Sequence, residues 1–133
     1  MKYVLMMTGT SEGWDESGLA GWSPEDFKAH VDFMQQIGDD LTASGELVGS
    51  EGLAPPQQAK VVKANPDGSP AVTDGPFPEA KEFLAGYWIV DVESEERAIE
   101  IAAHNSTAPG PGGAPLNMPI EVRQIMDAPS EDI

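Results

Sequence analysis

The sequence has no cysteine among its 133 residues, which excludes disulfide bonds, thiolate nucleophiles and thiolate metal sites. Basic residues are also scarce: seven Lys and Arg stand against 23 Asp and Glu, and the formal charge is −16. Proteins bind nucleic acid through basic surfaces, so we expect no nucleic-acid partner. We expect this charge mainly to keep the protein in solution, and an acidic face that binds a protein partner is the alternative.

Long apolar runs are missing as well. No segment approaches the length of a membrane span. The apolar run in "MKYVLMMTGT" is too short for the core of a signal peptide. We therefore expect a cytoplasmic protein that does not contact membranes. The chain length favours one domain, which we place at residues 1–127, followed by an acidic tail at residues 128–133.

Motifs for bound cofactors are absent from the sequence. Neither GxGxxG nor GxxxxGK[ST] occurs, so nothing supports a nucleotide site. The two histidines, His30 and His104, are not spaced as metal ligands on one element, and we predict no metal and no cofactor. His104 falls near the end of a predicted helix, where a histidine complements the helix dipole.

The hydrophobic pattern predicts an alternation of strands and helices. The first helix is the clearest, with Ser23 as N-cap, Asp26 placed to close a capping box and Gly45 as its stop. The other predicted elements are strands at residues 2–8, 46–56, 83–92 and 119–126, a hairpin at residues 59–74 and a second helix at residues 94–106.

This order of elements predicts an α+β fold. Without the hairpin it reads βαββαβ, the ferredoxin-like pattern, with an antiparallel sheet and both helices on one face. The first strand and the strand at residues 83–92 are apolar on both faces. The face without helices would then expose a large apolar patch, which soluble monomers rarely carry. We therefore expect a homodimer packed sheet to sheet.

The segment "TDGPFPEAKEFLAGYWIVDV" at residues 73–92 resembles the signature of the DGPF branch of the YCII-related superfamily. The segment "ASGELVGSEGLAP" at residues 43–55 is similar to the part of that family that follows the first helix. With the order of elements, the resemblance covers roughly residues 1–127. It implies a dimeric α+β barrel.

The resemblance implies two kinds of function. Some members are proposed to be cofactor-free acid–base enzymes that use a His on the first helix and an Asp near the following strands. Others lie near sigma-factor genes, which implies a regulatory role. Aligned on the glycine that ends the helix, the family His would fall near Met34, one turn after His30.

His30 and Asp74 are the predicted catalytic residues. His30 lies in the apolar arc of the first helix, where it would act as a base or be a core histidine bonded to a backbone carbonyl or a carboxylate. Asp74 opens the Asp-Gly-Pro turn, where it would orient His30 or hold the turn by a local hydrogen bond.

Glu51, Phe77 and Tyr87 are the predicted substrate-binding residues. Glu51 ends a strand, where a solvated acid is the alternative, and Tyr87 alternates with Trp88, so that only one of the two rings can face the helices. Phe77 belongs to the DGPF motif. Trp14 and Trp22 lie in a glycine-rich loop at residues 9–22, which they would pin to the body or close over a pocket as a lid.

Two functions from different classes follow. In the first, a small organic molecule binds between the first helix and the sheet, and His30 with Asp74 catalyses cofactor-free proton transfer of the lyase or isomerase type. In the second, the protein is a non-catalytic binding or regulatory module associated with a sigma factor, and its acidic surface binds a protein partner. A solvent-connected cavity at His30 would favour the first function, and a filled core would favour the second.

Overall fold

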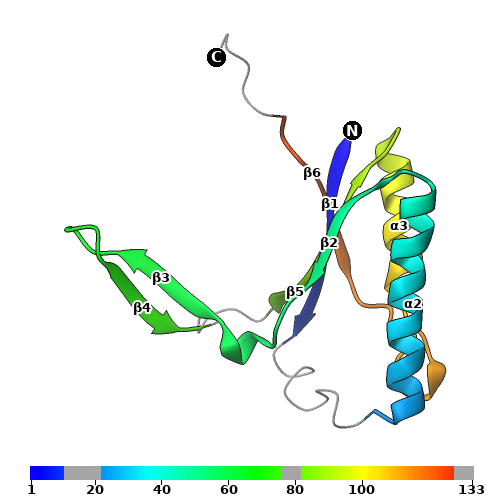
Figure 1. Cartoon of the computed structure of the whole chain (residues 1–133), viewed down its shortest axis with the longest axis horizontal. Coiled ribbons are helices and arrows are strands. Elements are labelled where there is room, and N and C mark those ends of the chain that lie inside the picture. Colours follow the sequence, from blue (N-terminus) through cyan, green and yellow to red (C-terminus); the bar gives the residue numbers. More distant parts are fainter. Residues whose placement is uncertain (11–21, 76–81, 128–133) are drawn as a thin grey trace.

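A computed structural model of the chain describes residues 1–10, 22–75 and 82–127 (Figure 1). The predicted tail at residues 128–133 lies outside these ranges. The elements are β1 (Lys2–Thr10), α2 (Pro24–Ala43), β2 (Leu47–Gly52), η2 (Pro56–Gln58), β3 (Lys60–Ala64), β4 (Pro70–Asp74), β5 (Glu82–Asp91), α3 (Glu95–Ser106), η3 (Pro111–Gly113) and β6 (Ile120–Gln124).

The predicted α+β class is confirmed. Four strands form an antiparallel sheet in the order β2-β5-β1-β6, and both helices lie on one face of it (Figure 1). Within the described ranges this sheet stays open and does not close into a barrel. None of the helices in the described part of the chain is long and apolar enough to cross a membrane.

The core lies between the two central strands and the helices. Tyr3 pairs with Val90 and Leu5 with Trp88, and all four side chains are buried. The helices contribute Ile37, Leu41, Ala98, Ile101 and Ala102 to the core cluster, and Val92, which follows β5, completes it. Because side chains alternate along a strand, the residues between these pairs point to the face without helices.

The ends of α2 follow the predicted signals, with one correction. Ser23 Oγ accepts a hydrogen bond from the backbone N–H of Asp26 at 3.1 Å, as an N-cap does. Gly45 follows the helix with a φ of 79°, a left-handed conformation that glycine adopts freely. The Asp26 carboxylate was predicted to close a capping box, but it accepts from the backbone N–H of Gly112 and so ties α2 to η3.

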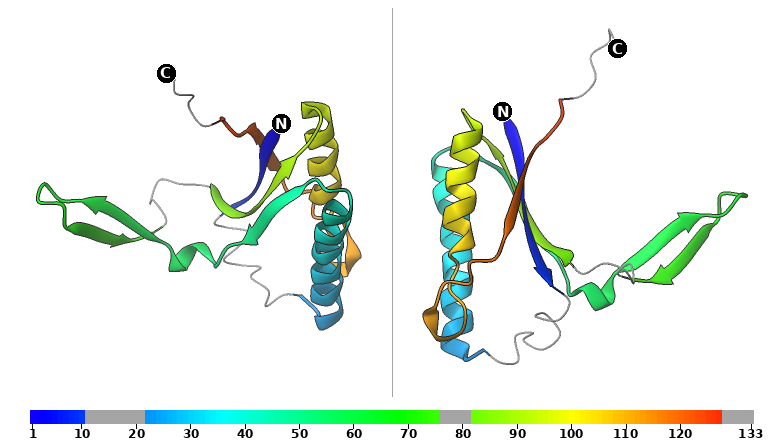
Figure 2. Two further views of the ribbon diagram at one scale, coloured as in Figure 1. Left: turned by 45° about the horizontal axis from the view of Figure 1, so that its top comes forward. Right: turned by 180° about the vertical axis from the view of Figure 1, so that it is seen from behind.

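The predicted hairpin is present and projects from the body (Figure 2). Its turn is stabilised by Asp67, whose carboxylate accepts from the N–H of Ser69 at 2.9 Å and from its hydroxyl at 2.6 Å. At the base of the hairpin, Lys60 forms an ion pair with Asp74. The N–H of Gly75 donates to the carbonyl of Ala59 at 2.7 Å, which closes the hairpin after its last strand.

A bidentate ion pair joins α3 to the start of β2. Arg97 donates from Nε and Nη2 to the two carboxylate oxygens of Glu46, each at 2.9 Å. The Glu46 side chain is only 17% exposed, and the hydrogen bonds from Arg97 lower its pKa from 4.5 to about 2. The charged form of Glu46 is therefore favoured in the folded protein.

Replacing Glu46 by glutamine removes the ion pair with Arg97 and should lower the free energy of unfolding at pH 7 by about 1–2 kcal/mol. The expected loss is no larger because Arg97 is 41% exposed and water screens its charge. The folded-state pKa is depressed, so this contribution is complete above pH 4.5 and disappears as the pH falls towards 2. Urea unfolding at several pH values measures it. Glu100→Gln is the control, since Glu100 also contacts Arg97 but is 67% exposed and should cost little. Equal effects of both substitutions would contradict the prediction.

Candidate functional site

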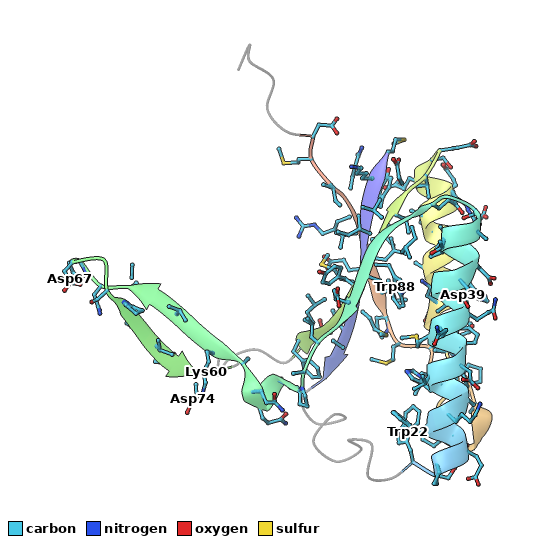
Figure 3. All side chains as sticks on the ribbon, in the orientation of Figure 1. Trp22, Asp39, Lys60, Asp67, Asp74 and Trp88 are labelled. Carbon is cyan, nitrogen blue, oxygen red and sulfur yellow. The ribbon has the colours of Figure 1, made fainter. Side chains whose placement is uncertain are left out.

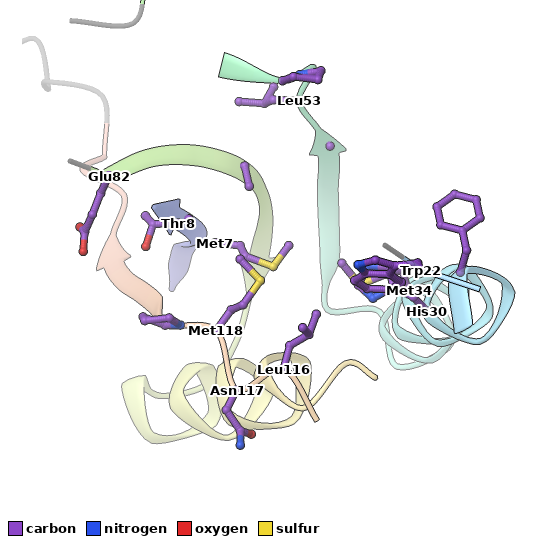
Figure 4. Close-up of a pocket in the computed structure, with 16 residues that line it drawn as sticks. Met7, Thr8, Trp22, His30, Met34, Leu53, Glu82, Leu116, Asn117 and Met118 are labelled. Atoms are coloured by element: carbon purple, nitrogen blue, oxygen red, sulfur yellow. The ribbon is translucent and has the colours of Figure 1, made fainter. Parts of the chain in front are cut away.

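A cavity of about 820 Å³ lies between the N-terminal half of α2 and one end of the sheet (Figure 4). Segments from five parts of the chain surround it. Its lining residues are Met7, Thr8, Gly9, Trp22, Phe27, His30, Met34, Gly52, Leu53, Pro55, Glu82, Ala85, Leu116, Asn117, Met118 and Pro119. Most of them are apolar, as is usual for sites that bind small organic molecules.

The cavity begins where the packing of α2 on the sheet ends. Ile37 and Leu41, in the C-terminal half of the helix, are buried in the core. Phe27 and Val31 share the apolar arc of α2 by helical spacing, but they are 41% and 42% exposed. The sheet thus covers only part of the apolar surface of α2, and the cavity adjoins the remainder.

His30 lies in the cavity wall and is held there by two contacts. Its Nδ1 lies 3.0 Å from the carbonyl oxygen of Pro109. Because a carbonyl can only accept, Nδ1 carries the hydrogen, and Nε2 of the neutral ring is left as an acceptor. The indole of Trp22 packs edge-on against the imidazole, with the ring centroids 5.3 Å apart and the planes at 89°. The Pro109 contact thus sets the tautomer of His30, and together with Trp22 it sets the position of the ring.

Methionines form much of the remaining wall. Met34 lies one turn after His30, at the position where the resemblance placed the family His, and it lines the same cavity. Met7 comes from β1 and Met118 from the segment before β6 (Figure 4). Methionine side chains adapt to irregular shapes, so this wall suits an apolar molecule more than one defined by many hydrogen bonds.

The segment after α3 fits closely around this wall. A Cβ placed on Gly110 would lie 2.5 Å from Cδ2 of Leu116, a contact that only glycine avoids. Asn117, next to Leu116, has a φ of 51°, a left-handed conformation that asparagine tolerates better than most residues. This close contact lies directly after Pro109, whose carbonyl bonds to His30, and Leu116 itself lines the cavity.

The structure does not bring Asp74 to His30 within one chain. Asp74 ends β4 on the projecting hairpin, where its side chain is 85% exposed and pairs with Lys60 (Figure 3). It is not among the residues that line the cavity. In the described structure its role is local, at the base of the hairpin.

Two of the predicted substrate-binding residues, Glu51 and Tyr87, do not line the cavity. Glu51 and Tyr87 are direct neighbours across β2 and β5. Tyr87 lies between the buried Gly86 and Trp88, so its side chain points to the face without helices. Phe77 and Trp14 lie outside the described residues. Of the five predicted site residues, His30 is the one that the structure places at the cavity.

Comparison with known proteins now identifies the family. The sequence profile of the YCII-related domain matches residues 1–113. The chain belongs to the family of YCII-related domains. A relative from Rhizobium meliloti (strain 1021), described as an uncharacterized protein, is 28% identical over 116 residues, which are 87% of this chain and 93% of the relative. The predicted resemblance is confirmed.

The sequence prediction gave no role to Leu116 and Met118 of the cavity wall, or to Pro109, which bonds to His30. Pro109 contributes its backbone carbonyl. The pattern of side chains in a sequence does not show which backbone carbonyl will form a hydrogen bond with a histidine. Leu116 and Met118 follow the Gly/Pro loop "TAPGPGGAP", whose path depends on tertiary packing. Trp22 was predicted either to pin its loop or to close a lid. Its ring packs against His30 and lines the cavity, and the loop before it lies outside the described residues.

The bond to Pro109 predicts the tautomer of His30. In the neutral ring the hydrogen should reside on Nδ1, whereas free histidine in water prefers Nε2. Nitrogen-15 NMR of the two histidines at pH 8 distinguishes the tautomers, and the more exposed His104 serves as the internal reference. An Nε2–H tautomer for His30 would show that the Pro109 contact is absent in solution.

Proposed function

We propose that this YCII-related protein binds a small, mainly apolar organic molecule in the cavity and that His30 acts there as a general base without a cofactor. The observation that carries the proposal is the position of His30. It is bonded through Nδ1 to Pro109, and it lines a cavity large enough for a small organic ligand. A filled core at His30 would have favoured a purely structural role.

The arrangement suits proton transfer within one bound molecule. Nε2 would take a proton from an acidic C–H or O–H group of the ligand. The positive charge that then forms on the imidazole is stabilised by the Pro109 carbonyl, which still accepts from Nδ1. Return of the same proton to another atom of the ligand gives an isomerisation, and its delivery to a leaving group gives an elimination. Apolar walls limit the loss of that proton to water.

In this proposal Pro109 takes the orienting role that Asp74 would have in a His–Asp pair. Asp74 pairs with Lys60 on the hairpin of the same chain. An Asp74 contribution to His30 would therefore require the hairpin of a second copy. The carbonyl requires no such rearrangement, because its bond to His30 is formed within the chain.

Proton abstraction can be tested before the substrate is known. We expect the protein to accelerate deuterium incorporation into some members of a panel of ketones, lactones and enones in D2O, followed by proton NMR. His30→Gln should reduce the accelerated rate by about 10²–10⁴-fold, the usual contribution of a general base.

His104→Gln is the matched control and should leave the rate unchanged, because His104 stacks on Phe33 and does not line the cavity. Exchange that persists in His30→Gln would refute the role of His30 as base. Ligand binding without exchange would instead identify a non-catalytic binding module.

We also propose that the βαββαβ unit is ferredoxin-like and that two copies pack through the sheet faces without helices to form a dimeric α+β barrel. Support comes from the alternation in the central strands. Val4 and Met6 of β1 and Tyr87 and Ile89 of β5 point away from the helices and are incompletely buried. A second copy would remove this apolar surface from water.

Ile89→Asp should convert the proposed dimer to a monomer, because it would place a carboxylate in the centre of the apolar interface. Sedimentation equilibrium measures the change, and circular dichroism checks that the variant is folded. Ile99→Asp is the control, since Ile99 is 52% exposed on α3. With a charge of −16 on each copy, dimerisation of the parent protein should also strengthen as salt is added. A monomeric parent protein would disprove the dimer.

A further inference from the structure

In the part of the chain that the structure describes, no Lys or Arg lines the cavity beside His30. Among the described residues that line it, Glu82 is the only Asp, Glu, Lys or Arg. We propose that the cavity selects uncharged or cationic ligands with an apolar body and excludes carboxylates and phosphates. This inference rests on the proposed function, because it names the ligand class of the same site.

No described Lys or Arg side chain is positioned to receive an anion in the cavity. Lys28 pairs with Asp32 on the surface of α2, and Lys60 pairs with Asp74 on the hairpin. Arg97 lies in the first turn of α3, and its guanidinium forms ion pairs with Glu46 and Glu100. The remaining described basic residues, Lys2, Lys63 and Arg123, do not line the cavity either.

The N-terminus of α2 does not replace the missing cation. Helix N-termini attract anions through free backbone N–H groups and the helix dipole. Here Ser23 already accepts from the N–H groups of Asp26 and Phe27. Glu25 and Asp26 place two negative charges in the first turn. An anionic ligand would therefore lose its hydration shell in the cavity without gaining a positive partner.

The polar groups of the cavity suit a different ligand. At one end, Nε2 of the neutral His30 can accept a hydrogen bond from a ligand O–H or N–H. At the opposite end, Glu82 lies near Thr8, and Met7 and Met118 lie between the two ends (Figure 4). A molecule with a donor at each end, or a cation at the Glu82 end, matches this arrangement.

Three probes with one apolar body and different head groups test the charge selection. They are 2-naphthylmethanol, 2-naphthylmethylammonium and 2-naphthoate, titrated into the full-length protein at pH 8 by isothermal calorimetry. We expect the alcohol and the ammonium to bind at least about 10-fold more tightly than the carboxylate, since an unpaired buried anion is disfavoured.

Substitutions at Glu82 assign the selection to the cavity. Glu82→Gln should weaken binding of the ammonium relative to the alcohol by roughly 3–10-fold, since an exposed charge is partly screened. Glu82→Lys should bring the affinity of the carboxylate up towards that of the alcohol. Glu121→Gln is the control: it removes one negative charge from β6 without touching the cavity and should change none of the three affinities.

The outcomes separate this inference from the proposed function. Equal affinity for all three probes, or a carboxylate affinity that does not change in Glu82→Lys, would overturn the charge selection and leave the ligand site in place. Equal effects of Glu82→Gln and Glu121→Gln would show that only the net charge matters, and would overturn it as well. Failure of every probe to bind would contradict the ligand site itself and with it both proposals.

Discussion

The antiparallel pairing of β1 with β5 is the contact on which the rest of the structure depends. These strands occupy the centre of the sheet, and their buried pairs, Tyr3 with Val90 and Leu5 with Trp88, form the surface on which both helices pack. The pairing shifts register after Met7, at the end of β1 that reaches the cavity. The ordered core thus stops where the cavity starts, and the apolar face of α2 continues beyond it.

Much of this fold was predictable because its signals are local. The Ser23 cap, the Gly45 stop and the hairpin turn each depend on the chemistry of a few adjacent residues, and each lies where the sequence placed it. Gly86 shows the limit of such reasoning. In the sequence it leaves a gap in an apolar strand, but in the structure the backbone of β2 fills that gap, and a Cβ on Gly86 would lie 2.9 Å from the carbonyl oxygen of Glu51.

The candidate site was predictable only where helical periodicity carries the information. His30 follows from the apolar arc of α2, and it does line the cavity. Asp74 was paired with it because the resemblance implies an Asp near the strands that follow the first helix. In the structure, Asp74 ends the projecting hairpin and pairs with Lys60. Which loop meets His30 depends on how the segment after α3 folds back, a non-local outcome that residue spacing does not encode.

The two interpretations of His30, a satisfied histidine and a general base, turn out to be compatible. A base in an apolar wall needs a fixed ring, a defined tautomer and a partner for the charge that it acquires. The bond from Nδ1 to Pro109 meets all three needs, while Nε2 is left as an acceptor. In the proposed function, the backbone contact that would mark a structural histidine in a filled core would instead prepare the ring to accept a proton. The cavity beside the ring is therefore the feature on which the proposed role of His30 as a base depends.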